Sequence, residues 1–175
     1  MTERITLIFG KTGTGKTTFA KSIVKNEQRL ICIDPLAEFD YEVFTDFESA
    51  YNYLTVNETY KVSIRFTNDL DFEYLFKLIF ELENITLVLE EAEIYISPSI
   101  RSSEFLRLVR YGRHRKINIV GIARRSAELS RDFRSQTNRI VSFKQTDIID
   151  LKNLELLGLT NLDNLNEHEY KEVFF

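Results

Sequence analysis

The fold is decided by the stretch Gly10-Lys11-Thr12-Gly13-Thr14-Gly15-Lys16-Thr17. This stretch matches the pattern G-x-x-x-x-G-K-[ST] at every fixed position. A short apolar run, Ile5–Phe9, precedes it, and Lys16–Lys25, which has helical character, follows it. Strand, glycine-rich loop and helix in this order predict a loop whose backbone N–H groups surround an anion at the positive end of the helix.

Each fixed position of this loop suits the phosphates of a nucleoside triphosphate. We expect Lys16 to reach the β- and γ-phosphates and the Thr17 hydroxyl to coordinate Mg²⁺, which prefers hard oxygen ligands and bridges the same phosphates. The sequence therefore predicts that the chain binds ATP with Mg²⁺. The predicted binding residues are Gly10, Lys11, Thr12, Gly13, Thr14, Gly15, Lys16, Thr17 and Thr18.

Apolar runs alternate with amphipathic stretches along the rest of the chain. The expected strands are Ile5–Phe9, Leu30–Ile33, Lys61–Phe66, Ile85–Leu89, Ile117–Ala123 and Arg139–Phe143. The expected helices are Lys16–Lys25, Phe47–Leu54, one that Asp69 opens, Ser102–Tyr111 and Ile148–Leu157, before an acidic tail. This alternation predicts one α/β domain over residues 1–175, with a mostly parallel sheet and helices on both faces.

The pattern within two of these strands predicts their surroundings. Lys61–Phe66 alternates apolar and polar residues, which is the period of a strand with one wet face, near the edge of the sheet. Ile85–Leu89 is apolar throughout, which is typical of a strand covered on both faces.

Two carboxylates follow the strand Ile85–Leu89. Glu90 and Glu91 lie at its carboxyl end, where sheets of this kind place their ligand crevice. Glu90, at a position where aspartate is usual, would orient the Mg²⁺ shell through a bound water. Glu91 would polarise a water for in-line attack on the γ-phosphate. The alternative is a strand that simply ends in solvated acids beside Glu93.

Composition indicates a soluble globular protein. Hydrophobic residues make up 43% of the chain and charged residues 29%, with 6 Gly and 2 Pro. No apolar run reaches the roughly 18 residues that a membrane helix needs, so we expect a cytoplasmic protein without a membrane span. The single cysteine, Cys32, lies in an apolar run and is expected to pack in the core.

Positive charge is concentrated in one segment. Residues 101–139 contain 11 Lys and Arg against 3 Asp and Glu, a balance of +8 in a chain whose net charge is −4. Affinity for a phosphate backbone depends on such a local patch rather than on the total charge. The alternative is a solvated basic helix.

Further motifs resemble those of the FtsK/HerA-type P-loop ATPases that move double-stranded DNA, and especially the small genome-packaging ATPases of tailless viruses. The resemblance spans most of the chain. Beyond the two phosphate-site motifs it rests on Ile31-Cys32-Ile33-Asp34-Pro35, on Arg110-Tyr111-Gly112-Arg113-His114-Arg115, on Ile117–Ala123 with Arg124-Arg125-Ser126, and on Arg134–Arg139 with Ile140-Val141-Ser142-Phe143.

The resemblance implies a RecA-like (ASCE) domain that works as a ring, usually a hexamer, with ATP bound between neighbouring subunits. It also implies an arginine that reaches the γ-phosphate of the next subunit, for which we name Arg113 first and Arg110 second. Many relatives carry a polar sensor, often glutamine, where this chain has Arg124. Arg124 is therefore the candidate γ-phosphate sensor.

The resemblance further implies a double-stranded DNA translocase, such as a viral genome-packaging motor. Residues 95–101, directly after the acid pair, are the candidate loop for sequence-independent contacts to DNA phosphates. A capsid or portal protein is a possible docking partner, with the protein in the host cytoplasm or on the virion. The small size of the chain favours the viral form over cellular translocases with an added N-terminal domain.

Two alternatives belong to other functional classes. One is a small-molecule phosphotransferase, because P-loop kinases share the fold. Such kinases generally lack an acid pair on the strand beside the P-loop strand, where we expect Glu90 and Glu91. The other is the ATPase of an assembly or secretion apparatus that never contacts DNA, against which only the +8 segment argues.

Overall fold

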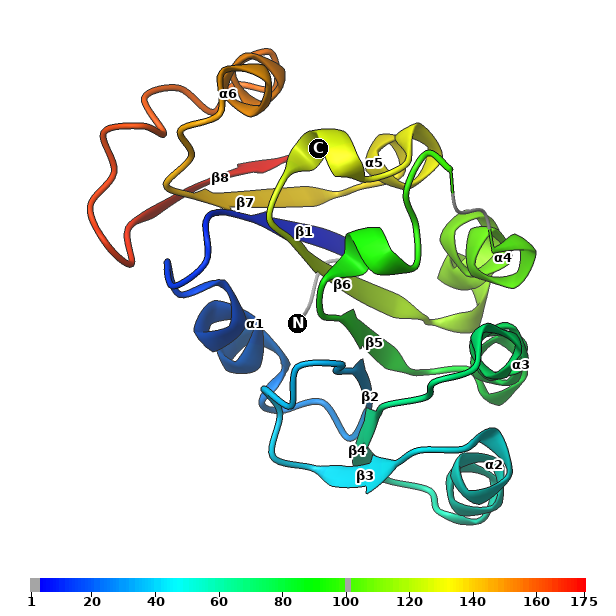
Figure 1. Cartoon of the computed structure of the whole chain (residues 1–175). Coiled ribbons are helices and arrows are strands. Elements are labelled where there is room, and N and C mark those ends of the chain that lie inside the picture. Colours follow the sequence, from blue (N-terminus) through cyan, green and yellow to red (C-terminus); the bar gives the residue numbers. More distant parts are fainter. Residues whose placement is uncertain (1–3, 100–101) are drawn as a thin grey trace.

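The computed structural model describes residues 4–99 and 102–175, which form one α/β layer structure around an eight-stranded sheet (Figure 1). The strand order is β3-β4-β2-β5-β6-β1-β7-β8. The strands are β1 Ile5–Phe9, β2 Arg29–Ile33, β3 Glu42–Phe44, β4 Tyr60–Ile64, β5 Thr86–Leu89, β6 Asn118–Ala123, β7 Arg139–Phe143 and β8 Tyr170–Phe174.

Six α-helices and three short 3-10 turns connect the strands in the described part of the chain. The helices are α1 Lys16–Val24, α2 Phe47–Val56, α3 Asp69–Leu82, α4 Ser103–Tyr111, α5 Arg131–Ser135 and α6 Ile148–Glu155, and the turns are η1 Ala92–Ile94, η2 Gly112–Arg115 and η3 Ser126–Glu128. Figure 1 shows α1 on one side of the sheet and α2, α3 and α4 on the other. The predicted α/β fold of the RecA-like P-loop type is confirmed.

The strands of the sheet are parallel except at one edge. β1 to β7 pair in parallel, whereas β8 runs antiparallel to β7, with Ile140 opposite Val173. The carboxyl ends of parallel strands all lie along the same side of the sheet, where the strands end. The loops after β1, β2, β5 and β6 therefore meet there, which is where a nucleotide crevice is expected.

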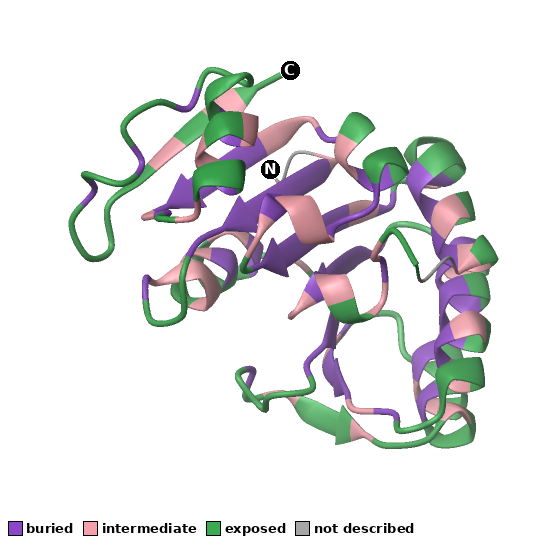
Figure 2. Cartoon of the chain, turned by 45° about the horizontal axis from the view of Figure 1, so that its top comes forward, coloured by how far each residue is buried: buried purple, intermediate pink, exposed green. Residues whose placement is uncertain are grey.

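Both faces of the sheet are covered by the core. Leu87 and Leu89 of β5 pack in the cluster beneath α2, α3 and α4, while Val88 between them packs in the cluster beneath α1. This alternation within one apolar run confirms that the strand is covered on both faces. Cys32 is fully buried in the α1 cluster, as predicted for a core residue. Figure 2 shows the buried strands between helices whose outer surfaces are exposed.

The expectation of a wet face on Lys61–Phe66 holds only in part, because Lys61 and Arg65 are partly exposed but the residue between them on this face is not. Ser63 in β4 is fully buried, and its hydroxyl donates to the carbonyl oxygen of Phe39 at 3.3 Å. The chain after β2 folds over this face of the strand, and β3 covers the edge of the sheet beyond it. A single hydroxyl that binds a backbone carbonyl produces the same alternation in sequence as a solvated side chain.

The place of β5 also differs from the expectation. We expected Glu90 and Glu91 on the strand beside the P-loop strand, but β6 lies between β5 and β1. The acid pair reaches the P-loop across the end of β6, which finishes in the small residue Ala123.

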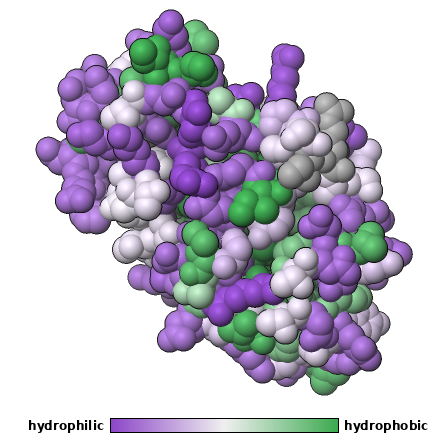
Figure 3. Space-filling view, in the orientation of Figure 1, coloured by the Kyte–Doolittle hydropathy of each residue, from purple (hydrophilic) through white to green (hydrophobic). Residues whose placement is uncertain are grey.

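Charge is divided along the sheet. Residues 38–83, which include β3, α2, β4 and α3, carry 11 Asp and Glu against 3 Lys and Arg, a balance of −8. Residues 101–139 carry the +8 already noted. Figure 3 shows a largely hydrophilic face with an apolar patch over α6. Ile148 and Ile149 of α6, and Leu156 directly after it, are each more than half exposed. Among the described helices, none has the length and apolar character of a membrane span.

Candidate functional site

The P-loop forms a tight turn between β1 and α1. Gly10, with φ +153°, lies so close to β7 that a Cβ atom there would be 2.7 Å from Cβ of Phe143. Gly15 caps α1 with φ +101° and leads directly into Lys16. Side chains at these two positions would be strained and would meet neighbouring atoms, so glycine is required for the loop to close against β7.

Side chains of the loop turn back onto its own backbone. The Thr14 hydroxyl donates to the carbonyl oxygen of Lys11 at 2.8 Å, and Nζ of Lys16 donates to the same oxygen at 3.0 Å. Burial lowers the pKa of Lys16, while the carboxylates of Glu90 and Glu91 act in the opposite direction. The ammonium group is thus held over the loop and faces the acid pair.

Thr17 and Glu90 meet at the mouth of the loop. The Thr17 hydroxyl donates to Oε1 of Glu90 at 2.5 Å. Glu90 is only 5% exposed, and its second carboxylate oxygen is buried without a hydrogen-bond partner among residues 4–99 and 102–175. Burial raises the pKa of Glu90 to about 7, against the effect of the Thr17 hydrogen bond. A buried carboxylate of this kind is suited to a cation.

The donor set fits Mg²⁺. Within the described parts of the chain no group of three or more His, Cys, Asp or Glu side chains could hold a metal ion unaided. Mg²⁺ in phosphate sites needs no such cage, because one or two protein oxygens, phosphates and waters complete its shell. The Thr17 hydroxyl and the unpartnered oxygen of Glu90 supply those protein oxygens.

Glu91, Arg124 and Glu93 form a cluster beside this pair. Nε of Arg124 donates to Oε2 of Glu91 at 3.1 Å and lies 3.6 Å from Oε1 of Glu93. Glu91 has φ +52°, the left-handed region, and begins η1. The pKa of Arg124 is raised, chiefly by the charge of Glu91. The structure thus brings Arg124 to the predicted catalytic acid of its own subunit. It also adds Glu93, which the sequence suggested only as a solvated neighbour.

Glu93 gives a test of this electrostatic environment. Burial, and after it the proximity of Glu91, raises the pKa of Glu93 to about 7 from 4.5. As pH rises, the Glu93 carboxyl loses its proton near pH 4.5 in the unfolded chain and near pH 7 in the folded chain. Its effect is therefore to lower the free energy of unfolding as pH rises from 4.5 through 7. We expect Glu93→Gln to gain about 3 kcal/mol of unfolding free energy over the wild type at pH 8, and no such gain at pH 4.5. Urea unfolding of both proteins at both pH values measures this difference in free energy. An equal difference between variant and wild type at pH 4.5 and pH 8 would contradict the burial of this charge.

Asp34 of the Asp-Pro motif has a structural part in the site. Its carboxylate is fully buried and accepts from the backbone N–H groups of Glu38 and Phe39, at 2.8 and 3.0 Å, and pairs with Arg65 at 3.1 Å. These contacts shape the turn after β2. That turn presents Leu36 and Glu38 to a cavity of about 100 Å³, which the P-loop and the acid pair also line.

A buried amide joins the ends of three segments at this edge of the sheet. Gln145, which is 2% exposed, donates from Nε2 to the carbonyl oxygen of Arg124 at 3.1 Å. Its backbone N–H donates to the carbonyl oxygen of Leu162 at 3.2 Å. The adjacent Lys144 accepts from the N–H of Lys11 at 3.3 Å. The loop after β7 therefore holds the P-loop, the end of β6 and the C-terminal segment together.

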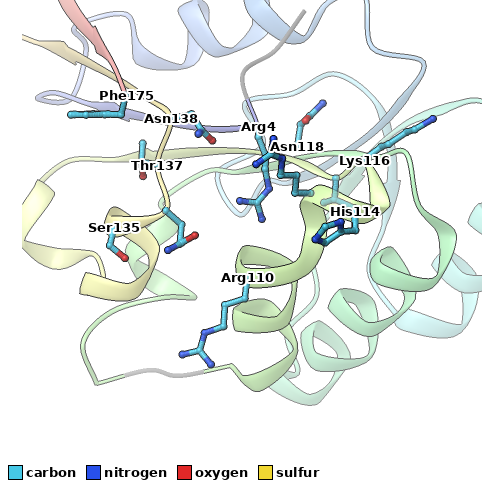
Figure 4. Close-up of a pocket in the computed structure, with 12 residues that line it drawn as sticks. Arg4, Arg110, His114, Lys116, Asn118, Ser135, Thr137, Asn138 and Phe175 are labelled. Atoms are coloured by element: carbon cyan, nitrogen blue, oxygen red, sulfur yellow. The ribbon is translucent and has the colours of Figure 1, made fainter.

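The structure places Arg110 and Arg113 at the opposite edge of the sheet from the P-loop of the same chain. They line a hollow of about 660 Å³ at the amino ends of β1, β6 and β7 (Figure 4). Its basic side chains are Arg4, Arg110, Arg113, His114 and Lys116, and within residues 4–99 and 102–175 no Asp or Glu side chain lines it.

Contacts around the hollow leave much of this charge uncompensated. Arg110 pairs with Asp132 at 3.4 Å, with both side chains more than half exposed. In the part of the chain that the structure describes, no carboxylate pairs with Arg113. Arg4 donates to the carbonyl oxygens of Leu108 and Val109 at the end of α4. Burial and the nearby charge of Arg113 lower the pKa of Arg4. Converging cations of this kind favour an anionic ligand.

The loop proposed for DNA is only partly available to a ligand. Ile96 is 2% exposed, and the ring of Tyr95 packs on Phe72 with 4.9 Å between centroids. Pro98 and Ser99 are exposed. Ile100 and Arg101, the remainder of the predicted loop, lie outside the described residues.

A protein-family comparison decides the family. Residues 1–168 match the model described as "Helicase HerA, central domain". The chain belongs to this family. It is therefore a P-loop ATPase of the FtsK/HerA type, as the motifs indicated, and the phosphotransferase alternative is set aside. Comparison with curated protein sequences gives no match.

Several solved structures share the fold of this HerA-family chain. The genome packaging NTPase B204 from Sulfolobus turreted icosahedral virus 2, in complex with AMPPCP, has 15% identity and a TM-score of 0.79, over 98% of this chain and 92% of that chain. The pCW3 conjugation coupling protein TcpA with ATPgS has 15% identity and a TM-score of 0.65, over 99% and 58%. The N-terminal domain of zonular occludens toxin from Neisseria meningitidis has 14% identity and a TM-score of 0.55, over 85% and 80%.

Proposed function

We propose that this HerA-family chain is an ATP-driven translocase of double-stranded DNA, of the viral genome-packaging kind, which hydrolyses ATP at the subunit interfaces of a hexameric ring. The observation that carries the proposal is the contact of Thr17 with Glu90 beside Glu91 and Arg124, which unites the phosphate loop with an acid pair. Similarity of fold to the genome packaging NTPase B204 supports the packaging form.

The nucleotide would be held by the P-loop, from Gly10 to Thr18. Backbone N–H groups at the start of α1 face its phosphates, and Lys16 supplies a cation that neutralises the β- and γ-phosphates. Thr17 and Glu90 would hold Mg²⁺, which supplies positive charge to the same phosphates when bound. The solved complexes of B204 with AMPPCP and ATP-gammaS support nucleotide binding by a fold of this kind.

Hydrolysis would depend on Glu91. Its carboxylate accepts a proton from the water that attacks the γ-phosphate, and the proton leaves with inorganic phosphate. Arg124 holds this carboxylate at 3.1 Å. An arginine that pairs with the base and that lies beside the γ-phosphate position is suited to sense whether that phosphate is present. Arg124 is thus the proposed sensor of its own subunit.

Arg113, with Arg110 beside it, would act on the nucleotide of the neighbouring subunit. Both lie far across the sheet from their own P-loop, in a hollow without acids. A guanidinium inserted from a neighbour stabilises charge on the transferring phosphoryl group. This arrangement couples hydrolysis to the subunit interface.

DNA would be held through its phosphates. The +8 of residues 101–139 supplies the sequence-independent attraction that a motor needs, because it must accept every sequence it passes over. The exposed part of the loop after η1 is a candidate contact. Within a virus-infected cell, the motor would work in the cytoplasm or on the virion, docked to a capsid or portal protein.

The test is steady-state ATP hydrolysis with and without long linear double-stranded DNA. We expect DNA to raise the rate several-fold and the stimulation to decline steeply between 50 and 200 mM salt, as phosphate contacts require. Heparin serves as the control for any polyanion. A rate that is indifferent to DNA at every salt concentration would refute translocation and favour the ATPase of an assembly or secretion apparatus.

A further inference from the structure

The C-terminal segment reaches the phosphate loop through a histidine. His168 lies in the acidic tail and is exposed, but its Nδ1 lies 2.9 Å from the position of a Cβ atom on Gly15. Gly15 caps α1, so the imidazole lies beside the helix end that faces the phosphates. A residue far away in sequence thus contacts the nucleotide loop.

The backbone of His168 is held in an unfavourable conformation. Its φ is +66°, in the left-handed region that non-glycine residues seldom adopt. A closed turn fixes it, since Oε2 of Glu169 accepts from the N–H of Asn166 at 2.9 Å and the N–H of Glu169 donates to the carbonyl oxygen of Asn166 at 3.3 Å. Conformations of this kind cluster at ligand sites, where the surrounding structure enforces them.

Packing on both sides of the turn maintains this position. The ring of Tyr170 lies 4.8 Å from that of Phe19 in α1 and 5.5 Å from that of Phe143 in β7. Before the turn, Leu162 and Leu165 are buried in the core. The segment that carries His168 is therefore anchored to α1 and β7 rather than trailing in solvent.

The arrangement of the strands indicates which end of ATP would lie near His168. Glu90, Glu91 and Arg124 follow β5 and β6, on one side of β1, and define the side of the metal and the γ-phosphate. β7 lies on the other side of β1. A triphosphate laid across the start of α1 with its γ end toward the acids has its nucleoside end toward β7, which is the side where His168 and Tyr170 lie.

We propose that His168 contacts the nucleoside of bound ATP, through a hydrogen bond to the ribose or base or by stacking its ring on the base. An imidazole offers both a donor or acceptor nitrogen and a flat face. This inference rests on the proposed function, because it takes the P-loop to hold ATP. It makes the 166–169 turn part of the site that distinguishes a nucleotide from a bare polyphosphate.

The chain has only 2 histidines, which permits a direct observation. Ring proton resonances of His168 and His114 can be resolved by NMR and assigned with His114→Gln. We expect Mg-ADP to shift the His168 resonances at saturation and Mg-triphosphate, which has no nucleoside, to leave them much less changed. At protein concentrations where the chain is monomeric, His114, in the basic hollow at the other edge of the sheet, is the internal control.

Binding of the two ligands to His168→Asn gives the second readout. Asparagine tolerates the left-handed conformation, so this variant removes the imidazole with little effect on the turn. We expect about a tenfold loss of affinity for Mg-ATP, and none for Mg-triphosphate. An unchanged affinity for Mg-ATP with unshifted His168 resonances would overturn this inference alone. A wild-type protein that binds neither ligand would overturn the proposed function with it.

Discussion

Glu91→Gln is expected to lower the rate of ATP hydrolysis at least a hundredfold while leaving Mg-ATP affinity within a few-fold of the wild type. Glutamine keeps the size of the side chain and can still contact Arg124, but it cannot accept a proton from water. Glu90 and Thr17, which would hold the metal, are untouched. Single-turnover hydrolysis and equilibrium binding on the same preparation separate the two effects.

The neighbouring acid is the matched control for this prediction. Glu93 lies in the same cluster and contacts the same guanidinium, but at 3.6 Å rather than 3.1 Å. We expect Glu93→Gln to retain hydrolysis within about tenfold of the wild type. If instead Glu93→Gln abolishes hydrolysis and Glu91→Gln does not, the base is Glu93, and the two carboxylates must exchange roles.

Arg113→Ala is expected to reduce hydrolysis by about a thousandfold with nucleotide affinity retained, because the side chain lies across the sheet from its own P-loop and would stabilise only the neighbour's phosphoryl transfer. Arg110→Ala, whose side chain already pairs with Asp132, should have the smaller effect. Hydrolysis rates under conditions where the protein self-associates measure both.

Mixing two inactive variants tests whether the arginine acts between subunits. Lys16→Ala removes the phosphate-binding lysine, and Arg113→Ala removes the proposed trans arginine. In an equal mixture about a quarter of the interfaces combine an intact P-loop with an intact Arg113, so activity should reappear. A mixture as inactive as its components would show that the arginine serves its own subunit, or a structural purpose.

The phosphate site was predictable because its residues follow directly from chemistry. A loop that folds around an anion needs glycine where a Cβ atom would collide, as at Gly10 against Phe143. A cation needs oxygens, and Glu90 follows a strand that is apolar apart from Thr86, which predicts burial on both faces. The strands β1, β2, β5, β6 and β7 were predicted for the same reason, since parallel strands covered on both faces are apolar throughout.

Other elements were not predictable because tertiary contacts form them. β3 has only three residues, which are largely exposed, and it exists by pairing with β4. β8 lies in a tail whose charges suggested solvent, yet it completes the edge of the sheet on β7. α5 is a single short helix between two loops. The position of His168 depends on that last strand, so no local pattern could indicate it.

Similar limits apply to the residues that join the site together. Gln145 is a single amide in a polar stretch, and its burial follows from three segments that converge on it. Glu93 lies within the 3-10 turn η1, whose start bends the chain back toward Arg124. Neither residue type carries a spacing rule, whereas the P-loop and the acid pair do.

The division of charge along the sheet bears on how copies of the chain approach one another. One end carries −8 in residues 38–83, and residues 101–139 carry +8, so each molecule has an electric polarity that its modest net charge of −4 conceals. Two copies that meet end to end, with the −8 segment of one against the +8 segment of the next, bring unlike charges together, and two that meet through the same segment bring like charges together. Contacts of the first kind are heterologous, so they repeat from copy to copy until they close into a cycle or grow into a filament. Electrostatics thus biases this chain against isologous pairs formed through either charged segment, and does so most strongly where little salt screens the field.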